Sequence, residues 1–151
     1  MVKIEDYDLP DELYYTTEHS WVKIEGDSVV FGITDFAQAL AEKVQAVQLP
    51  FEGEPVEFMK PFGTLESGKW TGKLYAPVDG EVTAFNEALW DDASLVNKEP
   101  YGLGWLVKVN PSNLQEDLSK LMKGGSDEFI EWQKSEIIRV KKEMEEQKKK
   151  E

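Results

Sequence analysis

The residues best placed to do chemistry lie in one short segment, Glu66-Ser67-Gly68-Lys69-Trp70. Short β-type runs at 63–66 and 73–75 flank this segment, so it is predicted to form the tip of a β-hairpin. Gly68 is expected to take a positive φ at the tip, because glycine has no Cβ to clash. Lys69 would then project into solvent, where a modifying enzyme can reach its amine. On this feature alone, a merely solvated loop lysine is the more common outcome.

Few other reactive side chains are available. The chain has no cysteine, which excludes disulfides, thiolate metal sites and cysteine nucleophiles. His19 is the only histidine, and it could either contact a group near Lys69 or make a structural hydrogen bond, of which the second is favoured. One histidine and scattered carboxylates cannot assemble a convincing catalytic triad or metal cluster. We therefore expect a protein that is not an enzyme and holds no metal.

The net charge of −13 lies almost entirely in residues 1–125, because residues 126–151 contain eight acids and seven bases. A surface of that sign repels phosphate backbones, so nucleic acid is not an expected partner. It favours basic protein partners, although acidity can also serve solubility alone. The acidic N-terminus carries no secretory signal and no stretch approaches membrane-spanning length. A cytoplasmic protein that binds no membrane is expected.

The elements that must position Lys69 are predicted to be mostly short strands. Between residues 51 and 109, Gly or Pro turns recur every few residues, which is typical of an all-β sandwich or barrel. Thr34 is expected to cap a short helix over residues 35–42. The predicted strands are 21–25, 28–33, 44–49, 63–66, 73–75, 81–85 and 105–109.

The chain is predicted to divide into three parts. Residues 1–12 read as a loose N-terminal arm, residues 13–124 as the main domain, and residues 125–151 as a C-terminal amphipathic helix. A further helix is expected over 113–123, ended by two glycines. The apolar residues of the terminal helix are expected to dock on the protein's own domain rather than on a partner, and the polar end after Met144 to fray. These apolar residues are Phe129, Ile130, Trp132, Ile137, Ile138, Val140 and Met144.

Over residues 14–123 an ordered set of motifs resembles the glycine cleavage system H-protein family. The segment Glu66-Ser67-Gly68-Lys69 is similar to that family's lipoyl-lysine signature, E-S-V-K. An ordered set at family spacing is far more specific than one pattern. The other matching segments are Tyr15-Thr16-Thr17-Glu18-His19-Ser20-Trp21-Val22, Gly32-Ile33-Thr34-Asp35-Phe36-Ala37-Gln38, Tyr75-Ala76-Pro77-Val78-Asp79-Gly80-Glu81-Val82, Asn86-Glu87-Ala88-Leu89, Leu95-Val96-Asn97-Lys98-Glu99-Pro100-Tyr101-Gly102 and Gly104-Trp105-Leu106.

The resemblance implies a mainly β fold, a barrel-sandwich hybrid of the lipoyl/biotinyl type with short helices and a C-terminal helical extension. It implies covalent lipoate on Lys69, flanked by Glu66, Ser67, Gly68 and Trp70. Lys73 is a much less favoured attachment site, because it lies outside the E-S-x-K spacing. The cofactor would carry the chemistry, while the protein presents it to partner enzymes. The implied partners are a lipoylating enzyme, glycine decarboxylase, aminomethyltransferase and lipoamide dehydrogenase.

Three positions near the arm depart from the family pattern. The family has a glutamate where this chain has Ser20 and an aspartate where it has Lys73, and these carboxylates face a cationic aminomethyl cargo. Losing both would weaken the attraction for such a cargo, although ordinary surface drift is an alternative. Trp70 replaces a small residue and could cover a dithiolane through sulfur–aromatic contact or pack across the hairpin. His19 falls at the family's H-x-W position.

Three functions therefore remain open. The first is a swinging-arm lipoyl carrier of glycine cleavage, which shuttles intermediates and reducing equivalents between enzymes. The second is a lipoate-binding protein that carries sulfur for a heterodisulfide-reductase-like sulfur oxidation complex, a branch that Ser20, Trp70 and Lys73 also resemble. The third is an unmodified H-like subunit with a binding or regulatory role.

Overall fold

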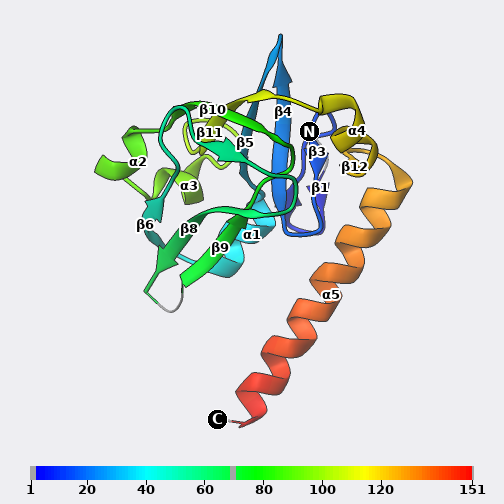
Figure 1. Cartoon of the computed structure of the whole chain (residues 1–151). Coiled ribbons are helices and arrows are strands. Elements are labelled where there is room, and N and C mark those ends of the chain that lie inside the picture. The colour runs from blue at the N-terminus through cyan, green and yellow to red at the C-terminus, as the bar shows by residue number, and fades with distance from the viewer. Residues whose placement is uncertain (1–2, 69–70, 151) are drawn as a thin grey trace.

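Antiparallel β-sheets form the centre of the computed structural model, which describes residues 3–68 and 71–150 (Figure 1). The larger sheet has the strand order β12 (Met122–Lys123), β3 (Tyr14–Tyr15), β4 (Ser20–Glu25), β5 (Ser28–Ile33), β11 (Val107–Pro111), β10 (Gly80–Phe85) and β7 (Pro55–Val56). The smaller sheet has the order β6 (Val44–Gln48), β8 (Pro61–Ser67) and β9 (Thr71–Tyr75). The predicted mainly β class and the main run of strands are confirmed.

Helices connect and cover these sheets. They are α1 (Asp35–Ala41), α2 (Ala88–Asp91), α3 (Leu95–Lys98), α4 (Leu114–Ser119) and α5 (Asp127–Lys150). Thr34 caps α1 as predicted, because its hydroxyl oxygen accepts the backbone N–H of Ala37 at 3.1 Å. The helix α4 is shorter than expected, since Met122 and Lys123 pair with β3 as the edge strand β12 rather than ending a helix. Hydrogen bonding to the free backbone edge of β3 is therefore more favourable for these two residues than continuing the helix.

The centre of the large sheet is fixed by a fully buried tryptophan. Trp21 is 1% exposed, and its indole N–H donates to the carbonyl of Pro100 at 3.1 Å. Its ring lies over Gly32 on the neighbouring strand, where an added Cβ would come within 2.5 Å of the indole. A buried indole packs and makes its hydrogen bond here only because residue 32 is glycine.

The N-terminal residues 3–12 are not the loose arm that was expected. The strands β1 (Lys3–Ile4) and β2 (Tyr7–Asp8) form a small hairpin, and Ile4 and Leu9 are 3% and 0% exposed. The prediction was wrong because two isolated apolar residues among charges give no periodicity, although each can fill a site in the core. Both belong to the same core cluster as Trp21.

The long C-terminal helix α5 docks on the protein's own domain through its first half (Figure 1). The ring of Phe129 stacks on that of Tyr15 with 4.2 Å between centroids, and Ile137 is 2% exposed. The predicted docking is thus confirmed, but Ile138 and Met144 face solvent at 68% and 53% exposure. The helix continues to Lys150 instead of fraying after Met144. Within the described ranges, no helix is long and apolar enough to cross a membrane.

Asp117 provides a first testable prediction about stability. Its side chain is 1% exposed, and Oδ2 accepts the backbone N–H of Asp79 at 2.8 Å. Burial raises the pKa of the Asp117 carboxyl above its usual value. The folded state thus holds the proton more tightly than the unfolded state. The unfolding free energy therefore falls as the pH rises from the ordinary pKa of an aspartate toward the folded pKa of Asp117, and this loss is complete above the folded pKa.

Asp117→Asn is therefore expected to raise the unfolding free energy at pH 7 by about 1 kcal/mol, because an amide oxygen still accepts the hydrogen bond without a charge. Asp117→Ala should instead lower it, since the Asp79 N–H loses its acceptor. Urea unfolding of both variants at neutral pH and at about pH 4 would measure the difference. A loss of stability in Asp117→Asn at neutral pH would contradict the expectation.

Candidate functional site

The predicted hairpin is present as strands β8 and β9, which run side by side to a free end (Figure 1). Thr64 pairs with Lys73, and Glu66 pairs with Thr71. Strand β8 ends at Ser67 and β9 begins at Thr71, so residues 68–70 join the two strands in the sequence. Lys69 and Trp70 themselves lie outside the described residues, so their predicted roles remain predictions.

The residues before Lys69 continue the strand. Glu66 is exposed and pairs with Ala46 of β6, Ser67 pairs with Val44, and Gly68 is exposed. The positive φ expected at Gly68 is wrong, since its backbone lies outside that region. Because β6 holds β8 as far as Ser67, the chain at Gly68 has only begun to leave the strand and needs no left-handed conformation.

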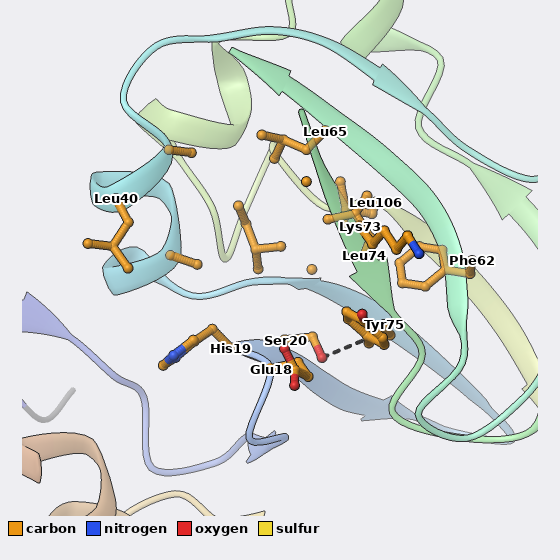
Figure 2. Close-up of a pocket in the computed structure, with 15 residues that line it drawn as sticks. Glu18, His19, Ser20, Leu40, Phe62, Leu65, Lys73, Leu74, Tyr75 and Leu106 are labelled. Atoms are coloured by element: carbon orange, nitrogen blue, oxygen red, sulfur yellow. Dashed lines mark hydrogen bonds between the residues drawn. The ribbon is translucent and has the colours of Figure 1, made fainter. Parts of the chain in front are cut away.

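A cavity of about 340 Å³ lies beside the hairpin, enclosed by β9, β4, β5 and α1 (Figure 2). Most of its lining is apolar and comes from Ile33, Ala37, Leu40, Ala41, Phe62, Leu65, Leu74 and Leu106. Its polar lining comes from Glu18, His19, Ser20, Lys73 and Tyr75. The cavity can therefore accept an aliphatic chain and offers polar groups at a few positions only.

Ser20 connects the two sheets at this cavity. Its hydroxyl donates to the carbonyl of Tyr75 at 3.1 Å, as Figure 2 shows, and lies 2.7 Å from the hydroxyl of Thr16. The side chain is 3% exposed and has its hydrogen bonds satisfied within the protein. Ser20 thus positions β9 against β4 and holds the base of the hairpin in place.

Two charged residues line the cavity, Lys73 from strand β9 and Glu18 from the turn before strand β4. Lys73, on β9, is exposed at the cavity as the sequence suggested. Glu18, two residues before Ser20, also lines the cavity and is exposed. Sequence reasoning missed Glu18, because it compared only the aligned position 20. Among the residues that the structure describes, the cavity lining therefore holds one carboxylate and one ammonium group, and the two charges oppose each other.

His19 is held by the C-terminal helix. Its Nε2 lies 3.2 Å from Oε1 of Glu136, and its ring lies between those of Phe36 and Trp132. Arg139 donates to both carboxylate oxygens of Glu136 at 2.8 and 2.9 Å. The favoured structural hydrogen bond is therefore present, and the same residue also lines the cavity.

The burial of His19 predicts a pH dependence of stability. Burial lowers the pKa of the His19 imidazole below its usual value, while the carboxylate of Glu136 partly opposes this shift. Above pH 6.5, both the folded and the unfolded states are neutral at this residue. As the pH falls from there toward the folded pKa, only the unfolded state takes up the proton, so the unfolding free energy falls.

His19→Gln is expected to remove this slope, because the amide can donate to Glu136 but does not titrate. Urea unfolding at several pH values between about 7 and 5 would measure it. The hydrogen bonds from Arg139 lower the pKa of the Glu136 carboxyl, so its own titration falls below that window. An unchanged slope in His19→Gln would show that His19 is not its source.

The fold and the cavity together define a carrier class of protein, in which a small β-rich domain presents one hairpin beside an apolar groove. The family model described as glycine cleavage H-protein matches residues 13–148. The chain is 46% identical over 123 residues to the glycine cleavage system H protein of Halalkalibacterium halodurans, covering 82% of this chain and 94% of that one. This chain therefore belongs to the glycine cleavage H-protein family, as its motifs indicated.

Other relatives agree with this assignment. The glycine cleavage system H protein of Bacteroides fragilis is 45% identical over 113 residues, which cover 75% of this chain and 89% of that one. The crystal structure of a glycine cleavage system H protein from Mycobacterium marinum superposes with a TM-score of 0.66 at 36% identity, covering 69% of this chain and 87% of that one. The predicted barrel-sandwich hybrid is thus confirmed, and the family is one of lipoate-bearing carriers.

Proposed function

We propose that this protein is a lipoyl carrier of the glycine cleavage type, with lipoate joined by an amide bond to Nζ of Lys69. The observation that carries the proposal is the register of the hairpin. Glu66 and Thr71 form its last described pair, and Lys69 lies between them in the sequence, at the lipoyl-lysine position of the family motif.

The cavity fits the group that the family implies. A lipoyl arm is an aliphatic chain that ends in a dithiolane, and the lining offers Leu40, Leu65 and Leu74 beside the hairpin. The dithiolane supplies redox and group-transfer chemistry when it is bound. Burial of the chain against these leucines is favourable at about 25 cal/mol per Å² of apolar surface.

The protein's own residues present and shield the arm rather than react. Ser20 fixes the hairpin against the large sheet through the carbonyl of Tyr75. Tethering makes each transfer intramolecular once a partner docks, so local concentration replaces affinity for a free intermediate. The partners in this role are a lipoylating enzyme, glycine decarboxylase, aminomethyltransferase and lipoamide dehydrogenase. The proposed role is that of a non-catalytic subunit.

The charges at the cavity support the glycine cleavage role over sulfur oxidation. The loss of carboxylates at Ser20 and Lys73 argued against a cationic cargo. Glu18 restores one carboxylate to the same cavity, only two residues along the chain from Ser20. One carboxylate therefore remains at the cavity for such a cargo, opposed by the ammonium group of Lys73.

Mass spectrometry tests the proposal directly. The protein should be produced in a host that lipoylates its own carriers and, as a control, in a host deprived of lipoate. The first sample is expected to gain one lipoyl group, and peptide mapping is expected to place it on residue 69. An unmodified protein from the competent host, or a group mapped to another lysine, would falsify the assignment.

A further inference from the structure

Three aromatic side chains form an exposed patch away from the hairpin, called here the aromatic patch. Phe85 lies at its centre, with ring centroids 5.7 Å from that of Phe51 and 5.0 Å from that of Trp90. Phe51 is 58% exposed and Trp90 is 56% exposed. Contiguous exposed aromatic surface of this kind is costly in water and commonly marks an interaction site.

The aromatic patch is held in one arrangement by its surroundings. Asn86, next to Phe85, is 6% exposed, and its amide donates to the carbonyls of Leu103 and Trp105 at 2.8 Å each. Its Oδ1 accepts the N–H of Ala88 at 3.3 Å, at the start of the helix α2 that carries Trp90. Leu103, in the loop that Asn86 holds, is itself 60% exposed. A rigid surface loses little entropy when a partner binds.

The charge around the aromatic patch is mostly negative, and its positive neighbour Lys98 lies 3.6 Å from Asp92 at the rim. The segments that supply the patch, residues 50–56 and 80–92, contain no lysine or arginine. They contain the exposed acids Glu52, Glu54, Glu81, Glu87, Asp91 and Asp92. This charge disfavours a second copy of the chain, which is equally acidic there, and also an anionic membrane. It favours a positive partner, whose arginines can also stack on exposed aromatic rings.

We propose that the aromatic patch is a docking surface for a basic partner protein that presents an apolar side chain flanked by arginines. The apolar side chain contacts Phe51 and Trp90, while the arginines pair with acids such as Glu52, Glu87 and Asp91. Contacts of this type combine a desolvated aromatic centre with a charged rim, which is the usual anatomy of a specific interface.

The location of the aromatic patch suits a carrier, and this step rests on the proposed function. The strand β6 begins at Val44, which pairs with Ser67 beside the hairpin turn, and leads away from it to Phe51. Its five residues alone span roughly 13–17 Å. A partner docked on the patch would therefore lie at a distance from Ser67, the last residue of β8, and need not cover that end of the hairpin.

A peptide titration tests the docking surface without any partner enzyme. The probe is acetyl-Arg-Leu-Arg-Leu-Arg-amide, and its control carries glutamate in place of arginine. In NMR spectra the arginine peptide is expected to shift the Trp90 indole N–H and the amides of residues 51–54 and 85–92. The double variant Phe51→Ala/Trp90→Ala should weaken binding about tenfold or more. The matched control Ile138→Ala removes an equally exposed apolar side chain from α5 and should bind like the wild type.

Three results would overturn the proposal. The first is a set of shifts spread evenly over the acidic surface, α5 included, and unchanged in the double variant. The second is concentration-dependent sedimentation that the double variant abolishes, since this would make a second copy the occupant. The third is binding to phosphatidylglycerol vesicles that depends on Trp90, which would make a membrane the occupant.

Enzyme kinetics test docking on the aromatic patch separately from the proposed function. The probes are glycine decarboxylase, aminomethyltransferase and lipoamide dehydrogenase of Halalkalibacterium halodurans, the source of the 46% identical relative, each assayed with the lipoylated protein. The double variant is expected to raise KM about tenfold for at least one enzyme with kcat unchanged. Unchanged KM for all three would overturn docking by these enzymes. If none accepts the wild type, the proposed function fails, while the peptide titration still decides on the docking surface.

Discussion

Lys69→Arg is expected to abolish lipoyl attachment completely, whereas Lys73→Arg should leave it intact. A guanidinium keeps the positive charge but is never deprotonated in proteins, so it cannot form the amide bond. Lys73 pairs with Thr64 inside the hairpin, two residues before Tyr75, and its side chain lines the cavity. A lipoylating enzyme that binds the connection between β8 and β9 would therefore reach the amine of residue 69 and not that of residue 73.

Intact-mass measurement of both variants from a lipoylation-competent host checks this expectation. Both substitutions replace an exposed or turn lysine, so the unfolding free energy should change by no more than about 0.5 kcal/mol. That match in stability makes the pair a controlled comparison of position alone. A lipoyl mass retained in Lys69→Arg, or lost in Lys73→Arg, would show that Lys69 is not the attachment site.

The hairpin could be predicted from sequence because its information is local. The β-type runs at 63–66 and 73–75 and the glycine-bearing turn between them lie within about a dozen residues, and the family motif falls on that turn. The cap of α1 by Thr34 is local in the same sense. Where a structural feature depends only on a residue and its neighbours in the chain, the sequence pattern predicts it correctly.

The surroundings of the hairpin could not be predicted, because they depend on contacts between distant segments. His19 and Glu136 lie 117 positions apart, and nothing in either segment indicates that they meet. The role of Glu18 likewise depends on how the turn before β4 faces β9, which only the packing of the sheets determines. The aromatic patch joins Phe51 to Phe85 and Trp90, which come from two segments more than 30 positions apart. Long-range register therefore decides which side chains share a site.

Gly63→Ala is expected to destabilise the small sheet and to reduce lipoylation with it. An added Cβ at residue 63 would lie 2.2 Å from the backbone oxygen of Gln48 on β6. That oxygen belongs to the main chain of a paired strand, so it cannot turn aside as a flexible side chain could. Separating β6 from β8 would also open the packing of Val47 against Leu65. A cost near 3 kcal/mol, at the upper end for overpacking, is expected.

The matched control is Gly68→Ala in the same hairpin. There the added Cβ would come no closer than 3.5 Å to Nε2 of Gln45, a flexible side chain, and the backbone φ is not positive. This variant should unfold like the wild type and accept lipoate in full, although it lies next to Lys69 in sequence. Urea unfolding and intact mass, measured on both variants, separate the geometry of the hairpin from mere proximity to the lysine. Equal stability of the two variants would show that the Gly63 contact with β6 does not position the hairpin.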